Sequence, residues 1–532
     1  MRTATTLGLA VLATLAMGGL VVGVLQTAGL ASAPPGAADA APVSVVPAPV
    51  ELVVRGGAPF TLSEGTGIAT DDASLDPVAA AYADAVAERA HVALAHVALA
   101  TDAPPADGDG PRIRFALDAT LGEEEYRLDV DADGIEVAAG APAGAFWAVQ
   151  TLLQLPAADD ATQVPAVAVR DAPRFAYRGA MLDVARHFFS VADVERYLDR
   201  LAALKLNVLH LHLTDDQGWR IQVDAHPELA EIGGRYAVDS DPGGYYTHED
   251  YRRIVAYAAE RFITIVPEID MPGHTNAALA SLAELNPDGA VAKPYTGIEV
   301  GFSSLDTRSE TTYAVIEDVL TELAALTPGP YLHIGGDESH ATQPEDYRSF
   351  VGRAAGIAAG TGKTVIGWHQ LGQSDQLPAG TVGQYWGYLE PEGDDAAEAR
   401  SIVDQGGQLI MSPADVAYLD MKYDILTPHG LTWAKGPTRI EDAYGWDPAA
   451  VLPGVGEEKL LGVEAPMWTE TLRTMDDVEQ MAMPRLAAMA EVAWTPQAAR
   501  DYAEFVPRLV TLARHWDAEG VRYLRPHGIP WP

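Results

Sequence analysis

The sequence contains no cysteine, which excludes disulfide cross-links, thiol catalysis and Cys-ligated metal sites. Positive charge is also scarce, because 35 Lys and Arg residues stand against 75 Asp and Glu residues, for a formal net charge of −40. So acidic a surface repels phosphate backbones and anionic lipid head groups. We therefore expect neither a nucleic acid nor a membrane surface as a partner of the mature protein. The charge is typical of a protein that stays soluble in an external medium.

Long apolar runs are missing except at the N-terminus. The first 33 residues hold a single charge and an apolar run from residue 7 to about residue 25, followed by the small residues Ala31-Ser32-Ala33. This order of features is typical of an export signal with its cleavage site. Residues 1–33 are therefore predicted to be a signal peptide, and residues 34–42, rich in Ala and Pro, a flexible tether.

Two features bear on how this N-terminal segment is processed. Pro34 disfavours cleavage directly after Ala33, which moves the expected cut to Ala31 or to Ala40. The apolar run is also longer than the core of an ordinary signal peptide. Secretion is the prediction, and an uncleaved anchor on the outer face of the cell membrane is the alternative.

The length and a change of pattern near residue 173 predict two domains. Residues 43–172 combine short strands, such as 50–54, 112–117 and 126–130, with an Ala-rich helix expected at 75–99. This pattern predicts a small α+β domain, and it contains no group of residues typical of catalysis.

Residues 173–532 instead alternate short apolar runs with amphipathic helical patterns, such as those at 191–205 and 248–261. Eight runs are expected to form strands: 178–184, 208–213, 264–268, 331–334, 364–368, 381–385, 408–411 and 460–465. Eight strand–helix units over about 340 residues predict a (β/α)₈ TIM barrel with long loops. The fold class is therefore α/β, with the small α+β domain in front of the barrel.

Function in such a barrel lies at the carboxyl ends of the strands. The eight runs are followed by acidic, basic and aromatic residues, namely Asp183, Arg186, His187, Asp215, Asp216, Asp270, His274, Asp337, Glu338, Trp368, His369, Trp386, Tyr418, Asp420, Trp468 and Glu470. Carboxylates and Arg bind hydroxyl groups in defined directions, and Trp faces pack on the apolar side of a pyranose ring. The strand ends therefore predict a site for a sugar.

Asp337 and Glu338 are the strongest candidates for the chemistry. They follow Gly335-Gly336, which lets the backbone leave the strand and place both acids around one ligand. Two such close carboxyl groups cannot both ionise freely, so one pKa is expected to rise toward the value that a general acid needs. The longer Glu338 is expected to reach the leaving oxygen of a glycosidic bond, and Asp337 to lie beside the sugar.

Seven segments carry a more specific resemblance to a known family. In these stretches the chain resembles glycoside hydrolase family 20, the β-N-acetylhexosaminidases. The matching segments are RGAMLDVARHF (178–188), LNVLHLHLTDDQGWR (206–220), VPEIDMPGH (266–274), HIGGDE (333–338), YLDMKYD (418–424), LTWA (431–434) and APMWTE (465–470). The resemblance also implies that the small domain is the one that precedes the barrel in many relatives.

The resemblance implies an exo-acting hydrolase that removes terminal N-acetylglucosamine or N-acetylgalactosamine with retention, without a cofactor. The substrate's own 2-acetamido oxygen would attack the anomeric carbon, an exception to the two-carboxylate scheme. Glu338 would act as general acid and then base, Asp337 would hold the acetamido N–H and stabilise its developing charge, and Tyr418 would bind the acetamido oxygen.

The resemblance gives the other site residues supporting roles. Trp368, Trp386 and Trp468 would wall the pocket for the sugar and its acetamido group. Arg178, Asp420 and Glu470 would recognise the ring hydroxyls. Asp215 and His274 would form a pair behind Glu338 that tunes it, and Trp433 would line the side of the leaving group.

Other interpretations stay open beside the hexosaminidase. His210-x-His212 is a spacing found in metal-dependent barrel hydrolases, but the later strand ends carry Trp, Tyr and Glu, so we expect core histidines and no metal. Besides the hexosaminidase and a metal-dependent hydrolase, a third alternative is a catalytically silent sugar-binding protein. The presence of Asp337 and Glu338 disfavours it, because a protein that only binds sugar has no need of these acids. The sequence leaves the preferred sugar epimer, the linkage and the oligomeric state open; chitooligosaccharides, and hence a part in chitin degradation, are the expected substrate of an exported enzyme.

Overall fold

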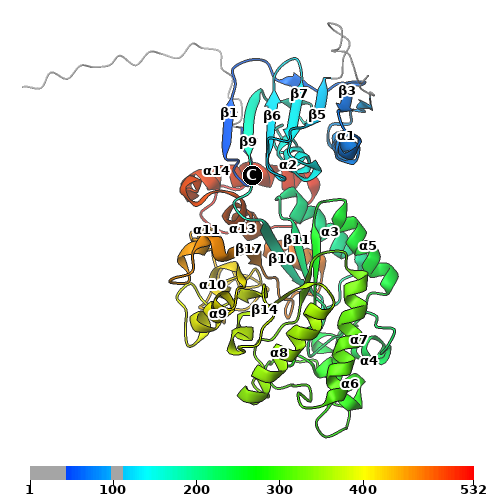
Figure 1. Cartoon of the computed structure of the whole chain (residues 1–532). Helices are drawn as coiled ribbons and strands as arrows, with labels where there is room; N and C mark the ends of the chain where they lie inside the picture. The colour runs from blue at the N-terminus through cyan, green and yellow to red at the C-terminus, as the bar shows by residue number, and fades with distance from the viewer. Residues whose placement is uncertain (1–42, 97–111) are drawn as a thin grey trace, which may run out of the picture. The chain divides into compact units, whose positions relative to one another are not determined.

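The computed structural model describes residues 43–96 and 112–532, shown as ribbons in Figure 1. The predicted signal peptide and tether lie outside the described residues. None of the helices in the described part of the chain is long and apolar enough to cross a membrane.

The small domain is built on a seven-stranded sheet with α1 (Asp76–Ala90) and α2 (Pro142–Leu152) packed against it. In spatial order the strands are β1 (Glu51–Val54), β9 (Val167–Asp171), β6 (Tyr126–Val130), β7 (Ile135–Ala139), β5 (Ile113–Leu117), β3 (Gly67–Thr70) and β4 (Ala95–His96). A two-stranded sheet, β2 (Phe60–Thr61) with β8 (Gln163–Val164), completes the domain. Strand β6 alternates buried and exposed side chains, as expected for a sheet with one covered face.

The Ala-rich helix of this domain is shorter than the sequence predicts. It was expected to reach residue 99, but α1 ends at Ala90 because His91 takes a left-handed backbone conformation, with φ +55°. Such a residue is a common helix terminator. The chain then turns into β4, where Ala95 pairs in parallel with Gly67 of β3.

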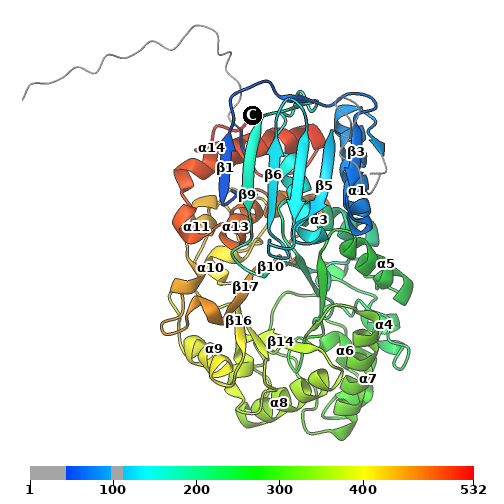
Figure 2. The same ribbon diagram turned by 45° about the horizontal axis from the view of Figure 1, so that its top comes forward.

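The second part of the chain is a closed barrel of eight parallel strands, and the predicted fold class is confirmed. The strands follow one another in sequence order: β10 (Tyr177–Asp183), β11 (Val208–His212), β12 (Thr264–Glu268), β13 (Tyr331–His333), β14 (Thr364–Trp368), β15 (Val382–Tyr385), β16 (Gln408–Met411) and β17 (Leu460–Ala465). Strand β17 closes the barrel on β10, where Tyr177 pairs with Gly462. Figure 2 shows the barrel strands among the helices that surround them.

Helices on the outside of the barrel begin at recognisable sequence signals. Ser190 before α3 (Val191–Ala203) and Thr247 before α5 (His248–Ala259) both form capping boxes, in which the cap and the third helical residue bind each other's backbone N–H. The other helices of ten residues or more in the described part of the barrel are α7 (Glu310–Leu326), α8 (Pro344–Gly360), α9 (Asp395–Asp404), α13 (Arg485–Trp494) and α14 (Tyr502–Glu519).

Shorter helices lie in the loops and near the C-terminal end of the barrel. They are α4 (Glu228–Gly233), α6 (Asn276–Ser281), α10 (Ala414–Ala417), α11 (Ile440–Tyr444) and α12 (Met475–Ala482). Three of them, α4, α6 and α10, belong to the loops that follow β11, β12 and β16 and so lie on the side of the strands' carboxyl ends.

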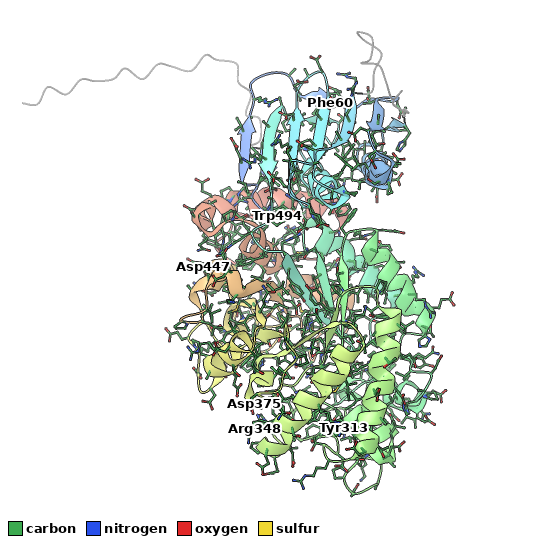
Figure 3. The ribbon with its side chains drawn as sticks, in the orientation of Figure 1. Phe60, Tyr313, Arg348, Asp375, Asp447 and Trp494 are labelled. Atoms are coloured by element: carbon green, nitrogen blue, oxygen red, sulfur yellow. The ribbon has the colours of Figure 1, made fainter. Side chains whose placement is uncertain are left out.

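The small domain contacts the amino end of the barrel. Trp494, labelled in Figure 3, donates its indole N–H to Asp171 of the small domain at 2.9 Å. The ammonium group of Lys205, buried between α3 and β11, lies 2.8 Å from the other carboxylate oxygen of Asp171. These contacts lie at the amino end of the barrel. The loops in which the sequence predicts the site lie at the opposite end, where the strands have their carboxyl ends.

Candidate active site

Five aromatic side chains, at the end of β14 and in the loops after β15, β16 and β17, form a continuous wall at the carboxyl end of the barrel. The ring of Trp368 lies 5.9 Å from that of Trp468, which lies 6.2 Å from Tyr418. Trp433 continues the wall, 5.7 Å from Tyr418 and 6.2 Å from Trp386. The structure therefore brings together all five aromatic residues that the sequence predicts for the pocket.

The turn after β13 places two acids beside this wall. Gly335 and Gly336 have φ +65° and +108°, and a Cβ on Gly335 would lie 1.7 Å from a carboxylate oxygen of Asp270. That oxygen accepts the Gly336 N–H at 2.9 Å, which anchors the turn. Glu338 itself has φ +40°, a strained conformation for a residue with a side chain, and such strain is concentrated at functional sites. The predicted role of the paired glycines agrees with this geometry.

Asp337 is a buried carboxyl group without a complete set of partners. Its side chain is buried, and its Oδ1 has no hydrogen-bond partner among the described residues. Burial raises its pKa to about 6; neighbouring Glu338 adds to the rise, and nearby His274, 3.7 Å away, opposes it. The raised pKa expected for one member of the Asp337–Glu338 pair thus belongs to Asp337. A buried acceptor with no partner indicates a donor that arrives with a ligand.

Glu338 is partly exposed and has an imidazole behind it. His274 Nε2 lies 3.5 Å from Glu338 Oε2, and His274 Nδ1 lies 3.2 Å from Asp215 Oδ1. Burial disfavours the charged imidazole, but the carboxylates of Asp215 and Asp337 raise the pKa of His274 well above its ordinary value. The predicted pair of Asp215 and His274 is therefore in place, with a protonated imidazole facing both acids.

Asp420 and Glu470 form a second group of unsatisfied acids at the carboxyl end of the barrel. Both carboxylate oxygens of Asp420 and Oε2 of Glu470 are buried and lack hydrogen-bond partners within the described chain. Burial, followed by the charge of Glu470, raises the pKa of Asp420 well above its ordinary value. Leaving such acceptors unpaired costs about 1–3 kcal/mol each, so this corner is suited to a ligand that supplies hydroxyl donors.

Arg178 does not belong to the site, and its predicted contact with the ring hydroxyls is wrong. It is the second residue of β10, so about 16 Å of strand separate it from the carboxyl end at Asp183. Its side chain is buried at the other end of the barrel, where both terminal nitrogens bind Glu124 of the small domain at 3.0 and 2.7 Å. Its guanidinium also lies over the ring of Trp494. Arg178 therefore joins the two domains.

Arg186 supplies the cation of the site instead. It follows the carboxyl end of β10, its Nη2 lies 2.9 Å from Asp215 Oδ2, and its guanidinium lies 4.8 Å from the ring centre of Trp468. Its charge also opposes the rise in the pKa of Glu470 that burial causes. The sequence carried the signal for this assignment, because Arg186 follows the end of the strand and Arg178 stands at its beginning.

Models of known families match nearly all of the described chain. The catalytic domain of glycosyl hydrolase family 20 matches residues 175–347 and 340–497, and domain 2 of the same family matches residues 43–172. The chain belongs to glycoside hydrolase family 20. It is therefore a glycoside hydrolase, as the seven matching segments predict.

Relatives of known activity agree with the family. A β-N-acetylhexosaminidase of Cellulomonas fimi is 42% identical over 496 residues, which cover 92% of this chain and 97% of that protein. The solved structure of N-acetyl-β-hexosaminidase from Streptomyces plicatus, in complex with Thio-NAglucal, is 46% identical with a TM-score of 0.87, covering 92% of this chain and 97% of that one. The family 20 β-N-acetylhexosaminidase from Streptomyces coelicolor A3(2) is 47% identical with a TM-score of 0.86, covering 92% and 98%.

Two acids at the strand ends of this family 20 barrel tie its loops together. Asp183 accepts the backbone N–H groups of Arg186 at 3.0 Å and Thr469 at 3.1 Å, and so ties the loops after β10 and β17 together. Asp216 accepts the hydroxyl of Ser303 at 2.6 Å, which ties the loop after β11 to the loop after β12.

The buried histidines of the barrel could hold a metal by distance alone. His210, Glu268 and His333 offer ligand atoms within 4.8 Å of one another. However, the two nitrogens of His210 face carboxylates, Glu464 at 2.9 Å and Glu268 at 3.1 Å, and these carboxylates raise its pKa to about 9 against the effect of burial. Both nitrogens of His210 are thus engaged by carboxylates, which accounts for its burial as a core residue.

A separate cavity of about 810 Å³ lies at the other end of the barrel. Its lining includes Phe175, Asn207 and Thr264 near the amino ends of β10, β11 and β12, and Glu123 of the small domain. It contains none of the unsatisfied acids or aromatic residues described above. The chemistry of the family therefore belongs to the carboxyl end.

Proposed function

We propose that the protein is an exo-acting β-N-acetylhexosaminidase that uses the substrate's 2-acetamido group as its nucleophile and retains the anomeric configuration. The relatives named above are hexosaminidases, which supports the reaction. One observation supports the mechanism: the carboxyl group of Asp337, next to Glu338 in the chain, is buried, and its Oδ1 has no hydrogen-bond partner in the part of the chain that the structure describes. That place suits an acceptor for an amide N–H, which a plain glycosidase does not need.

The first step makes one bond and breaks one. The acetamido oxygen attacks the anomeric carbon, the bond to the leaving oxygen breaks, and Glu338 gives its proton to that oxygen. Positive charge develops on the cyclised acetamido group, where ionised Asp337 accepts its N–H and stabilises the charge. Tyr418 binds the acetamido oxygen, and Trp368 and Trp468 enclose the group.

The second step regenerates the enzyme. Water attacks the anomeric carbon from the side that the leaving group vacated, and Glu338 takes a proton from it. The ring of the intermediate opens and restores the acetamido group. Two inversions give net retention, and Glu338 returns to its protonated form without a covalent bond to the protein.

The buried acids at the far corner support exo action. Within residues 43–96 and 112–532, three carboxylate oxygens of Asp420 and Glu470 have no hydrogen-bond partner, and a terminal sugar can offer free hydroxyl groups to them. A sugar inside a polymer has one of these positions occupied by the next unit. Chitooligosaccharides are the proposed substrates, and we propose secretion, or an anchor on the outer face of the membrane, from the N-terminal signal.

The test compares aryl N-acetylglucosaminides with aryl glucosides. If the acetamido group is the nucleophile, glucosides should be cleaved slower by several orders of magnitude, because the attacking group is absent. A stable thiazoline mimic of the cyclised intermediate should inhibit strongly. Comparable rates on both sugars, or a 2-fluoro sugar trapped on Asp337 in mass spectra, would show an ordinary two-carboxylate enzyme instead.

A further inference from the structure

Glu268, the last residue of β12, lies at the centre of the barrel and is fully buried. Its Oε1 accepts the indole N–H of Trp368 at 3.0 Å and lies 2.9 Å from His333 Nδ1. Its Oε2 contacts His212 Nδ1 and lies 3.1 Å from His210 Nε2. A single carboxylate thus faces nitrogen atoms from three neighbouring strands.

One of these contacts leads to the wall of the sugar pocket. Trp368 is 1% exposed, and the hydrogen bond from its indole N–H to Glu268 holds the orientation of its ring. The ring lies 5.9 Å from Trp468 and belongs to the same apolar cluster as Tyr418. A change at Glu268 is therefore transmitted to the surface that encloses the acetamido group.

A second contact leads to the general acid. His212 Nε2 lies 2.9 Å from Asp215, Asp215 lies 3.2 Å from His274, and His274 lies 3.5 Å from Glu338. With a carboxylate on each nitrogen, His212 donates from both sides, and these carboxylates raise its pKa well above its ordinary value against the effect of burial. The route from Glu268 to Glu338 is thus a series of charged groups, joined by hydrogen bonds as far as His274 and by an ion-pair contact from His274 to Glu338.

We infer that Glu268 is a positioning residue that holds the acetamido pocket through Trp368 and the general acid through His212, Asp215 and His274. The inference rests on the proposed function, since it acts on the groups that carry the reaction. A carboxylate can serve both contacts because it only accepts hydrogen bonds. An amide in its place would turn an N–H₂ group toward either Trp368 or His212, which are both donors.

The test is Glu268→Gln with three measurements. We expect kcat/KM on a disaccharide of N-acetylglucosamine to fall about 10- to 100-fold, the size of a lost hydrogen bond to a charged group. The fall in kcat/KM should be several-fold smaller on an aryl N-acetylglucosaminide with an activated leaving group, because its leaving oxygen needs less protonation. The inhibition constant of the thiazoline should rise about 10-fold, because the pocket wall is released.

Glu464→Gln is the matched control. Glu464 is an equally buried carboxylate that accepts from Tyr177, His210 and Gln384, and it contacts neither Trp368 nor His212. The Glu464→Gln variant should lower Tm as Glu268→Gln does. It should nevertheless change kcat/KM by the same factor on the disaccharide and on the aryl substrate, and it should leave the inhibition constant of the thiazoline unaltered. Equal behaviour of the two variants in all three measurements would overturn the inference.

Two further variants test each contact alone, and they decide the matter if Glu268→Gln does not fold. His212→Gln should reproduce only the loss that depends on the leaving group, and Trp368→Phe, which keeps a ring but removes the N–H, only the weaker thiazoline binding. Absence of both effects overturns the inference. The proposed function has a separate test: it fails if Glu338→Gln lowers the activity on the disaccharide and on the activated aryl substrate by the same factor.

Discussion

Replacing Asp337 by Asn should stabilise the folded protein while it removes the activity. The folded-state pKa of Asp337 is about 6 against an ordinary value of 3.8, because the carboxyl group is buried beside Glu338. Each pKa unit corresponds to about 1.4 kcal/mol, so the buried charge costs about 3 kcal/mol of folding free energy at pH 7.5. An amide has no charge to bury, and the variant should recover this energy.

The pH dependence of this contribution to stability follows from the ionisation of Asp337 in the unfolded and the folded protein. Below pH 3.8 the carboxyl group is protonated in both the unfolded and the folded protein, so it costs nothing. Between pH 3.8 and 6 the unfolded chain loses the proton and the folded protein keeps it, so stability falls as pH rises. Above pH 6 the full penalty applies. The advantage of Asp337→Asn should therefore shrink to about 1 kcal/mol at pH 4.5.

Thermal unfolding at two pH values measures this effect. An unfolding entropy of about 2.1 cal/mol/K per residue converts 3 kcal/mol into a rise in Tm of about 3 °C at pH 7.5 for a chain of this size. Asp375→Asn, at an exposed position labelled in Figure 3, is the control and should leave Tm unchanged at both pH values. The kcat of Asp337→Asn should fall about 10²- to 10³-fold. A variant that is no more stable at pH 7.5 than the parent would refute the reasoning.

Four other outcomes are expected. Glu338→Gln should abolish turnover of disaccharides and harm activated aryl substrates much less, since an amide cannot deliver a proton; equal losses would remove Glu338 from the role of acid. Activity should survive exhaustive chelation, and a loss restored by zinc would contradict the assigned roles. Arg178→Met should lower Tm, because it leaves Glu124 without its buried partner, but leave KM unchanged, whereas Arg186→Met should raise KM. N-terminal sequencing of the secreted protein should find a start between residues 32 and 41; intact Met1 in a membrane fraction would show an anchor.

The sequence predicted the barrel and most of the candidate site because both follow from local patterns. Each apolar run is a strand, and whatever follows a strand in a parallel barrel arrives at the same end. Asp337 and Trp468 are more than 100 residues apart, yet the rule alone places them together. The small domain was harder, since one left-handed residue, His91, ends a helix whose composition favours continuation.

Arg178, the one predicted site residue that the structure contradicts, was assigned wrongly because its position within the strand was not considered. Arg178 and Arg186 both lie in the segment that resembles the family, so similarity alone does not separate them, whereas the direction of β10 does. The contacts of Glu268 could not be predicted, nor could the choice of Asp337 over Glu338 as the acid with the raised pKa. Both depend on which side chains from distant strands meet in the interior and on how completely water is excluded there, and spacing along the chain reports neither.

The joint at the amino end of the barrel determines how small an expressible fragment can be. Arg178 and Lys205, both fully buried, take their anionic partners Glu124 and Asp171 from the small domain. A fragment that starts at residue 173 would leave two unneutralised cations and uncover the indole of Trp494, which binds Asp171 in the whole protein. Such a fragment should aggregate even though it contains every proposed catalytic residue, so the smallest workable enzyme has to begin near residue 43.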